Sequence, residues 1–244
     1  MYRDRSVCVV VPAHNEERHI AAVIRGCPPL LVDHIVVVDD LSSDGTVEVV
    51  REEADPRVIL VQHQVNQGVG GALVSGYREA LRLHAGAVVV MAGDDQMDPA
   101  YLPALLDPIC LGRADVTKGN RLYSWNSMRR MPALRIVGTV GLTWLTRAAT
   151  GYWHLSDAQN GYVAFAGEAL ARVNLAALSR GYAAENTMLM ELSRTGARVQ
   201  DVPIPARYGT EVSGMHIWRD GPMIASIVVG GIAARLARRR RAES

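Results

Sequence analysis

Ala87-Val-Val-Val-Met-Ala-Gly-Asp-Asp-Gln-Met-Asp-Pro99 joins an apolar run to a cluster of polar side chains. The run as far as Ala92 predicts a short strand buried on both faces, because uninterrupted apolar residues are typical of parallel sheets that are covered on both sides. Asp94, Asp95 and Gln96 follow this strand. Carboxylate and amide oxygens are the ligands that suit Mg²⁺ or Mn²⁺.

A structural role for the same acidic stretch competes with metal binding. Asp98 precedes Pro99, and this pair favours the start of a helix, since Asp caps a helix N-terminus and Pro fits its first turn. We interpret the stretch as serving both purposes. Asp98 caps the helix, and Asp94 and Gln96 bind the metal.

Strand and helix patterns alternate through the first half of the chain. Apolar β-branched runs predict strands at residues 7–11, 34–38 and 58–62, and helical patterns occupy residues 16–25, 46–54 and 72–84. Strands separated by helical patterns of about ten to fifteen residues predict βαβ units and a parallel sheet. The predicted fold class is α/β, with a Rossmann-like, mostly parallel sheet flanked by helices.

Polar residues follow each of these strands. Asn15, Asp39, Asn66 and Asp94 all lie just beyond a predicted strand. Ligands of parallel sheets bind outside the carboxyl ends of the strands. We therefore expect these side chains to meet in one ligand site.

The second half of the chain is less regular. Strands are expected near residues 115–119, 163–166 and 198–202, and helices near residues 136–149 and 185–195. Neither a linker nor a repeat interrupts the pattern, so we predict one domain over residues 1–220.

Composition limits the classes of partner. The net charge is +1, and the last ten residues hold five Arg and one Glu, so the rest of the chain is slightly acidic. Such a body has no electrostatic footprint for nucleic acid. The three cysteines are scattered, which predicts reduced thiols in a cytoplasmic setting.

The C-terminal segment, residues 221–244, combines apolar and basic character. Gly221 to Ala234 contains fourteen residues without a charge, and arginines follow at 235 and 238–241. A bilayer span needs roughly 20 apolar residues, so we predict an interfacial helix that holds the protein peripherally on an anionic membrane surface. The alternative is a helix packed on the body with a solvated charged end.

The glycine-rich stretch Gly68-Val-Gly70-Gly71 does not fit a dinucleotide-binding motif. That motif belongs in the first βα turn, and Leu73 stands where a third Gly is expected. We interpret the glycines as sites where the backbone approaches a ligand or packs tightly under a helix.

The chain resembles the inverting family 2 glycosyltransferases of GT-A fold, and among them the polyprenyl- and dolichyl-phosphate sugar synthases. The matching motifs are Val11-Pro-Ala-His-Asn-Glu-Glu17, Val37-Val-Asp-Asp-Leu-Ser-Ser-Asp-Gly-Thr46, Asn66-Gln-Gly-Val-Gly-Gly71, Gly93-Asp-Asp-Gln-Met-Asp-Pro99 and Gly119-Asn-Arg121. The likeness extends from about residue 6 to residue 214. The stretch from Gly151 to Tyr162 looks most like bacterial polyprenyl-phospho-N-acetylgalactosaminyl synthases.

The resemblance implies a nucleotide site at the first strands. Its implied members are Pro12, Ala13, Asn15, Glu16, Asp39, Asp40, Asn66, Gly68 and Asp94. Asp39 or Asp40 would accept a hydrogen bond from the base. A carboxylate pairs equally well with the imide N–H of uracil and with N1–H of guanine, so it does not select the nucleotide.

One departure from the family pattern concerns the metal. The family commonly has Asp-x-Asp-x-Gln at this position, and the first Asp falls on Ala92. The implied protein ligands are therefore Asp94 and Gln96, with Asp95 as a substitute and the donor's diphosphate completing the shell of Mg²⁺ or Mn²⁺.

The resemblance also implies how the reaction is assisted. Arg207 matches the family's diphosphate-binding arginine, and Arg121 and Arg135 match those that bind the acceptor phosphate, so Asp94, Asp95 and these three arginines are the expected catalytic set. On the acceptor and sugar side we expect Thr139, Asp157, Gln159, Asn160 and Glu185 as well. Gln159 and Asn160 could equally bind their own loop, and Glu185 could serve the start of a helix.

The implied activity is transfer of a sugar, an N-acetylhexosamine, from a UDP-sugar to polyprenyl phosphate at the cytoplasmic face of the membrane, for cell-envelope glycan. GDP-mannose or UDP-glucose is the alternative donor. The sequence also allows a nucleotide-sugar sensor or a sugar nucleotidyltransferase, although the latter class has a basic first loop where Glu16 and Glu17 stand. Whether a small membrane protein adds to the anchoring is left open.

Overall fold

The computed structural model describes residues 1–123, 133–205 and 217–242. Within these ranges, seven strands form one sheet in the order β3-β2-β1-β4-β6-β5-β7. Their bounds are β1 Val7–Ala13, β2 His34–Asp39, β3 Val58–Gln62, β4 Ala87–Val90, β5 Val116–Asn120, β6 Val163–Ala166 and β7 Val199–Pro203. The strands β1 to β4 are mutually parallel where they pair, which confirms the predicted α/β class and its parallel first half.

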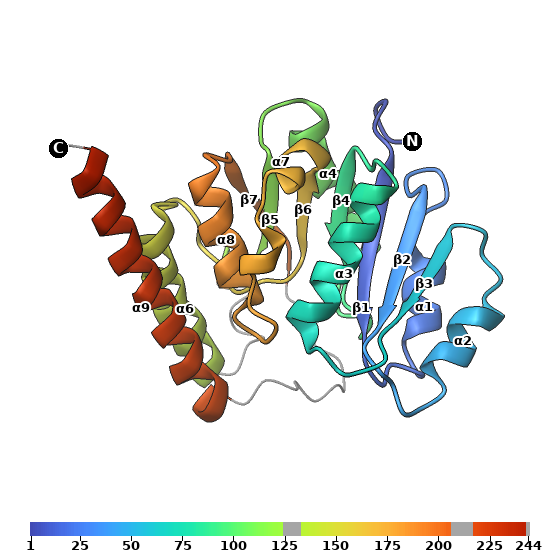
Figure 1. Cartoon of the computed structure of the whole chain (residues 1–244). Helices are drawn as coiled ribbons and strands as arrows, with labels where there is room; N and C mark the ends of the chain where they lie inside the picture. Colours follow the sequence, from blue (N-terminus) through green and yellow to red (C-terminus); the bar gives the residue numbers. More distant parts are fainter. Residues whose placement is uncertain (124–132, 206–216, 243–244) are drawn as a thin grey trace.

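Helices cover both faces of this sheet (Figure 1). The bounds are α1 Ile20–Gly26, α2 Thr46–Glu52, α3 Val69–Arg82, α4 Leu102–Cys110, α6 Ala133–Thr150, α7 Gly167–Ala171, α8 Ala184–Arg194 and α9 Ile217–Ala242, with short 3₁₀ helices η1 Pro99–Tyr101 and η2 Leu175–Ala177. One buried cluster joins α1, α2 and α4 to one face of the sheet. A second joins α3, α7 and α8 to the other face.

Strand alternation explains the two clusters. Val7, Val9 and Val11 of β1 belong to the first cluster, and Cys8 and Val10 belong to the second. Successive side chains of a strand point to opposite faces, so an uninterrupted apolar strand fills both cores at once.

The strand β6 is antiparallel to both of its neighbours, β4 and β5. It separates the parallel strands β1 to β4 from the parallel pair β5 and β7. The alternation of patterns along the sequence did not predict this reversal.

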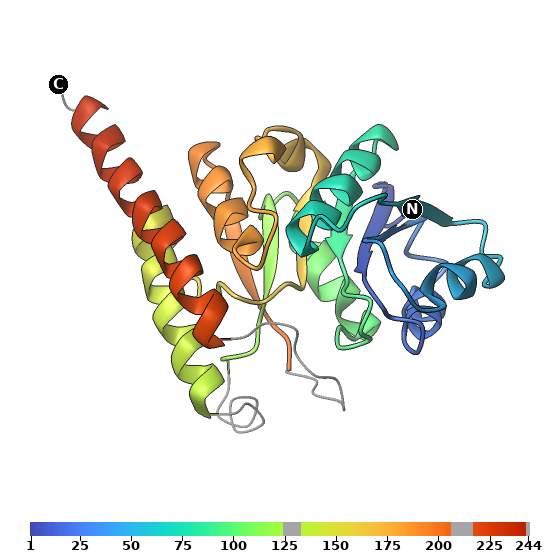
Figure 2. The ribbon, with the colours of Figure 1, turned by 60° about the horizontal axis from the view of Figure 1, so that its bottom comes forward.

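The helices α6 and α9 form a pair beside the sheet, next to α8 (Figures 1 and 2). Ile224 and Val228 of α9 are fully buried in a third apolar cluster with Ala149 of α6 and Met190 of α8. The helix α9 begins before residue 221, so the predicted boundary at that residue lies inside one continuous helix. No described helix combines the length and apolar content needed to cross a membrane.

Candidate active site

A cavity of about 1020 Å³ opens beyond the carboxyl ends of β1, β2 and β4. Of the residues predicted from the sequence, those that line it are Pro12, Ala13, Asn15, Glu16, Asp40, Asn66, Gly68, Asp94 and Gln96. Asp39 and Asp95 are not among the lining residues. The parallel topology therefore brings these separate sequence motifs to one place, as the positions after the strands predicted.

The loop after β1 is fixed by bonds to the loop after β2. Asn15 has a left-handed backbone with φ of 59°, and its Oδ1 accepts a hydrogen bond of 2.8 Å from the backbone of Ser43. The backbone of Glu16 donates to Oγ1 of Thr46 at 2.8 Å. These bonds hold the chain in a turn, which is why α1 begins at Ile20 and not at residue 16 as predicted.

Asp40, and not Asp39, faces the cavity. The carboxylate of Asp39 accepts weak bonds of 3.3 and 3.4 Å from the backbone of Ser42, inside its own turn. Asp40 lines the cavity although its side chain is 4% exposed. Its Oδ1 accepts hydrogen bonds from the backbone of Gln67 at 2.8 Å and from Nδ1 of His63 at 2.7 Å.

Asn66 lies beside Asp40 and binds its backbone. Nδ2 of Asn66 donates to the carbonyl of Asp40 at 3.2 Å, and its Oδ1 accepts from the backbone of Gly68 at 3.1 Å. His14 also contacts that carbonyl, at 2.9 Å from its Nδ1. Asn66 thus shapes the loop that precedes α3, in addition to lining the cavity.

The acidic turn follows β4, on the opposite side of β1 from β2 and Asp40. Oδ1 of Asp94 accepts a 3.1 Å bond from the backbone of Gln96, and Asp95 has a left-handed φ of 57°. The chain continues beside β1 through Gly93, whose N–H donates to the carbonyl of Pro12 at 3.2 Å. Asp98 caps η1 through a 2.9 Å bond to the backbone of Ala100, which confirms the predicted cap.

Glu16 and Asp94 both line the cavity, and their charges interact. A Cβ built on Gly93 would lie 3.1 Å from Cγ of Glu16, so the two loops touch. Burial raises the pKa of the Glu16 carboxyl, the contact with His19 lowers it, and the charge of Asp94 raises it further. In the described residues, no three His, Cys, Asp or Glu side chains gather closely enough to hold a metal by themselves. Two neighbouring carboxylates that repel each other are nevertheless a donor set that fits a divalent cation.

A second set of predicted residues lies in the segments that follow β5 and precede β6. The carboxylate of Asp157 is fully buried and binds Arg121 through two side-chain bonds, of 2.7 Å to Nε and 3.1 Å to Nη2. Asn160 donates to the carbonyl of Gly119 at 2.8 Å and accepts from the backbone of Tyr162, so its amide binds the backbone on both sides. Of the two roles left open for Asn160, this geometry is that of a residue that holds its loop.

The sequence did not lead us to predict Lys118 as a residue of this set. It is 1% exposed on β5, and its Nζ donates to Oε2 of Glu185 at 2.6 Å and to the carbonyl of Asn160. A lysine inside the short strand Val116-Thr-Lys-Gly-Asn120 was the available signal, because a buried ammonium requires a partner. Glu185, in the first turn of α8, supplies that partner.

Other predicted members differ in how they are placed. Thr139 is 7% exposed on α6, and Nε2 of Gln159 is buried with no hydrogen-bond partner among the described residues. Neither of them lines the cavity, and the same holds for Arg121, Asp157, Asn160 and Glu185. Arg207 and the side chain of Arg135 lie outside the described part of the chain.

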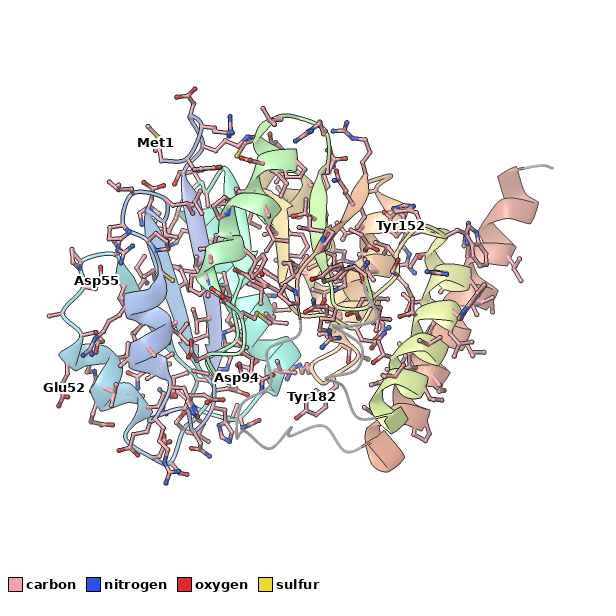
Figure 3. All side chains as sticks on the ribbon, turned by 180° about the vertical axis from the view of Figure 1, so that it is seen from behind. Met1, Glu52, Asp55, Asp94, Tyr152 and Tyr182 are labelled. Atoms are coloured by element: carbon pink, nitrogen blue, oxygen red, sulfur yellow. The ribbon has the colours of Figure 1, made fainter. Side chains whose placement is uncertain are left out.

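The glycine-rich stretch packs against a loop near residue 180. The backbone of Gly70 donates to the carbonyl of Arg180 at 2.7 Å, and a Cβ at Gly70 would collide with the carbonyl oxygen of Ser179. This close approach brings Tyr182, which is 37% exposed, to the cavity. Figure 3 shows Asp94 and Tyr182 at the same end of the molecule. The sequence did not predict Tyr182 as a site residue, because its distance from the glycines along the chain hides the contact.

Residues 8–172 match the family described as glycosyl transferase family 2. The chain belongs to that family. This membership confirms the prediction of a family 2 glycosyltransferase of GT-A fold.

Named relatives of this glycosyltransferase act on lipid phosphates. It is 28% identical to UDP-N-acetylglucosamine–dolichyl-phosphate N-acetylglucosaminyltransferase of Methanococcus voltae, over 86% of this chain and 88% of the relative. It is 31% identical to polyprenol monophosphomannose synthase of Mycolicibacterium smegmatis, over 80% and 75%. It is 29% identical to undecaprenyl-phosphate mannosyltransferase of Micrococcus luteus, over 94% and 95%.

A solved structure of another enzyme has the same fold. Glucosyl-3-phosphoglycerate synthase of Mycobacterium tuberculosis, crystallised with Mn²⁺, uridine diphosphate and phosphoglyceric acid, superposes with a TM-score of 0.70 at 21% identity, covering 95% of this chain and 78% of that one. At this identity the likeness concerns the fold.

Proposed function

We propose that this glycosyltransferase moves an N-acetylhexosamine from a UDP-sugar to polyprenyl phosphate at the cytoplasmic face of the membrane. The observation that carries the proposal is the cavity, which is lined by Asp40 on one side of β1 and by Asp94 and Gln96 on the other. A nucleoside diphosphate requires a partner for its base and oxygen ligands for the cation on its diphosphate, and these residues can supply both. The names of the relatives support the lipid phosphate as acceptor.

The negative charge of the departing nucleoside diphosphate would be stabilised at the acidic turn after β4. Asp94 and Gln96 would hold Mg²⁺ or Mn²⁺, with Asp95 as the substitute. When bound, the ion would act as a Lewis acid on the diphosphate. Asp94 also orients the turn, since its Oδ1 already holds the backbone of Gln96.

The acceptor requires positioning more than activation. A phosphate monoester is largely ionised at neutral pH, so no strong general base is needed. Arg121, Arg135 and Arg207 are proposed to bind the phosphate groups. Asp157 presents the Arg121 guanidinium in a fixed orientation by binding it at two nitrogens. Arg121 keeps 16% of its side chain exposed, and a guanidinium binds phosphate oxygens with charge-assisted hydrogen bonds.

A donor panel tests the function. We expect purified protein with Mn²⁺ and polyprenyl phosphate to form lipid-linked product fastest from UDP-N-acetylhexosamines, detected by thin-layer chromatography of radiolabelled sugar. GDP-mannose is the second candidate, favoured by the mannose-specific names of two relatives. A preference for GDP-mannose would replace the proposed donor, and no lipid product from any nucleotide sugar would contradict transfer to a lipid phosphate.

Membrane contact is proposed for the exposed faces of α6 and α9. Val137, Val140 and Trp144 are 70%, 38% and 56% exposed, and their spacing of three and four residues puts them on one face of α6. Trp153, 55% exposed, packs edge-on to Trp144 at 6.2 Å between ring centroids. Exposed Trp side chains favour the interface of a bilayer, and the arginines at 238–241 favour anionic lipid.

Substitution on this face is expected to weaken lipid binding. Replacing Val137 and Trp144 by Ser should lower the partition coefficient onto anionic phosphatidylglycerol vesicles by about tenfold or more, because burying one large side chain contributes about 1.5–3 kcal/mol. Sedimentation with vesicles measures it. Leu30→Ser, at an apolar residue that is 92% exposed, is the matched control. Deleting 221–244 would be less informative, since it removes the buried Ile224 and Val228. Unchanged sedimentation of the double variant would refute the contact.

A further inference from the structure

A buried chain of side chains lies behind the base-binding end of the cavity. Nδ1 of His63 bonds Oδ1 of Asp40 at 2.7 Å, and Nε2 of His63 bonds Oγ of Ser75 at 2.8 Å. His63 is 8% exposed and is not among the residues that line the cavity. Ser75 belongs to α3, whereas His63 and Asp40 follow β3 and β2 directly.

The partners determine which ring nitrogen carries a proton. A carboxylate only accepts hydrogen bonds, so Nδ1 of His63 must be the donor to Asp40. Neutral His63 then has an accepting Nε2, and the hydroxyl of Ser75 donates to it. Both ring nitrogens are bonded, which fixes the plane of the imidazole and the direction in which it holds the carboxylate.

The two oxygens of Asp40 are used differently. Oδ1 accepts from both His63 and the backbone of Gln67. Oδ2 accepts no hydrogen bond from the described residues, and Asp40 lines the cavity. The backbone of Asp40 is held as well, because its N–H donates to the carbonyl of Ala13 at 2.9 Å. The carboxylate is therefore fixed at one oxygen while the other remains available to a ligand.

We propose that His63 is a positioning residue for base recognition: it fixes Asp40 so that Oδ2 meets a ring N–H of the donor's base. This inference rests on the proposed function, because it requires a nucleotide in the cavity. Uracil and guanine both present a ring N–H next to a carbonyl group, so the same carboxylate would serve either. His63 itself does not touch the nucleotide.

The alternative is that His63 merely ties β3 to β2 and contributes only stability. The two roles differ in what a substitution changes. A tie between strands affects binding of all ligands in proportion to the folded fraction. A positioning residue affects the base selectively and leaves binding of the diphosphate unchanged.

The test compares UDP, GDP and inorganic pyrophosphate, each with Mn²⁺, by isothermal titration calorimetry on the full chain. We expect His63→Leu to weaken binding of the preferred nucleotide by about 10- to 100-fold, as for loss of a hydrogen bond to a charged group. Binding of pyrophosphate should change less than about twofold. His63→Asn retains an N–H donor near the Nδ1 position, and we expect it to recover most of the nucleotide affinity.

A milder variant covers the case in which His63→Leu does not fold. Ser75→Ala removes only the far end of the chain, and we expect a loss of about threefold to tenfold in nucleotide affinity. Ser193→Ala is its matched control, because it also removes one hydroxyl that donates a hydrogen bond. Ser193 is on α8 and does not line the cavity, and its Oγ donates to the carbonyl of Thr150 at 2.6 Å. That control should bind the nucleotide like the wild type.

The outcomes separate the two levels of the proposal. If the wild type binds UDP or GDP more tightly than pyrophosphate and the folded His63 and Ser75 variants do so equally well, the positioning role is refuted and the proposed function stands. If binding of pyrophosphate falls in parallel with the nucleotide, the role is structural and the inference also fails. If the wild type prefers neither nucleotide over pyrophosphate, the proposed function fails and the inference fails with it.

Discussion

Asp94→Asn is expected to lower kcat by about 10³-fold, within the range for loss of a group that stabilises developing charge on a leaving group. The variant keeps the size of the side chain and its carbonyl-type oxygen, which can still accept from the backbone of Gln96. It loses the negative charge that we propose binds the cation. Initial rates with saturating Mn²⁺ and UDP-sugar measure the effect.

Two neighbours in the same turn serve as controls for Asp94. Asp98→Asn makes the same chemical change at a residue that caps η1, and Asn is as good a cap as Asp, so its kcat should stay within about twofold of wild type. Asp95→Asn tests the substitute ligand. A wild-type rate for Asp94→Asn together with a large loss of rate for Asp95→Asn would assign the role of metal ligand to Asp95. Wild-type rates for both would contradict catalysis through this turn.

Arg121→Ala is expected to lower the free energy of unfolding by about 3–5 kcal/mol, the usual loss when one partner of a buried ion pair is removed. The fully buried carboxylate of Asp157 would lose the guanidinium that binds it. Asp201 lies close by, and burial raises its pKa, with the charge of Asp157 adding to the rise. Unfolding in urea, followed by circular dichroism, measures the change.

A surface pair provides the matched control for Arg121. Arg198 also binds a carboxylate, that of Asp115 at 2.9 Å, but its side chain is 59% exposed. Arg198→Ala should therefore cost at most about 1 kcal/mol. The double variant Arg121→Ala with Asp157→Ala should recover part of the loss, because no buried charge then remains at this pair. Equal losses in the free energy of unfolding for Arg121→Ala and Arg198→Ala would show that the buried ion pair contributes no more stability than the exposed one.

The acceptor role of Arg121 is tested on the same proteins. Arg121→Lys keeps the charge but cannot bind Asp157 at two nitrogens. If Arg121 also binds the acceptor phosphate, this variant should show a KM for polyprenyl phosphate raised by more than about fivefold and an unchanged KM for the UDP-sugar. An unchanged KM for the lipid would restrict Arg121 to its bond with Asp157.

The first half of the fold could be predicted because its information is local. Each strand from β1 to β4 is followed by its own helix, and the apolar runs are long enough to be distinguished from the amphipathic helices. The positions of Asn15, Asn66 and Asp94 followed from this alternation, since parallel strands end at the same edge, and all three line the cavity. Asp39, the fourth residue expected there, does not line it, and its neighbour Asp40 does.

The second half could not be predicted to the same depth, because its contacts join distant segments. Lys118 and Glu185 are 67 residues apart, and Arg121 and Asp157 are 36 apart. The local sequence around one residue of such a pair does not indicate which distant residue is its partner. The same holds for His63, 23 residues from Asp40, whose role depends on the pairing of β2 with β3. The antiparallel β6 likewise follows from tertiary packing and not from local pattern.

The position of β6 has a consequence for the order in which the chain folds during synthesis. β5 pairs only with β6 and β7 among the described strands, and both lie later in the sequence. Residues 7–90 include four strands whose partners all lie within this range apart from the pairing of β4 with β6, so the first half of the sheet has its partners early. Val116–Asn120 must wait as an unpaired strand until residues 163–166 emerge from the ribosome. During that interval the backbone N–H and C=O groups of β5 have no partner strand, and an unpaired strand is a template for aggregation.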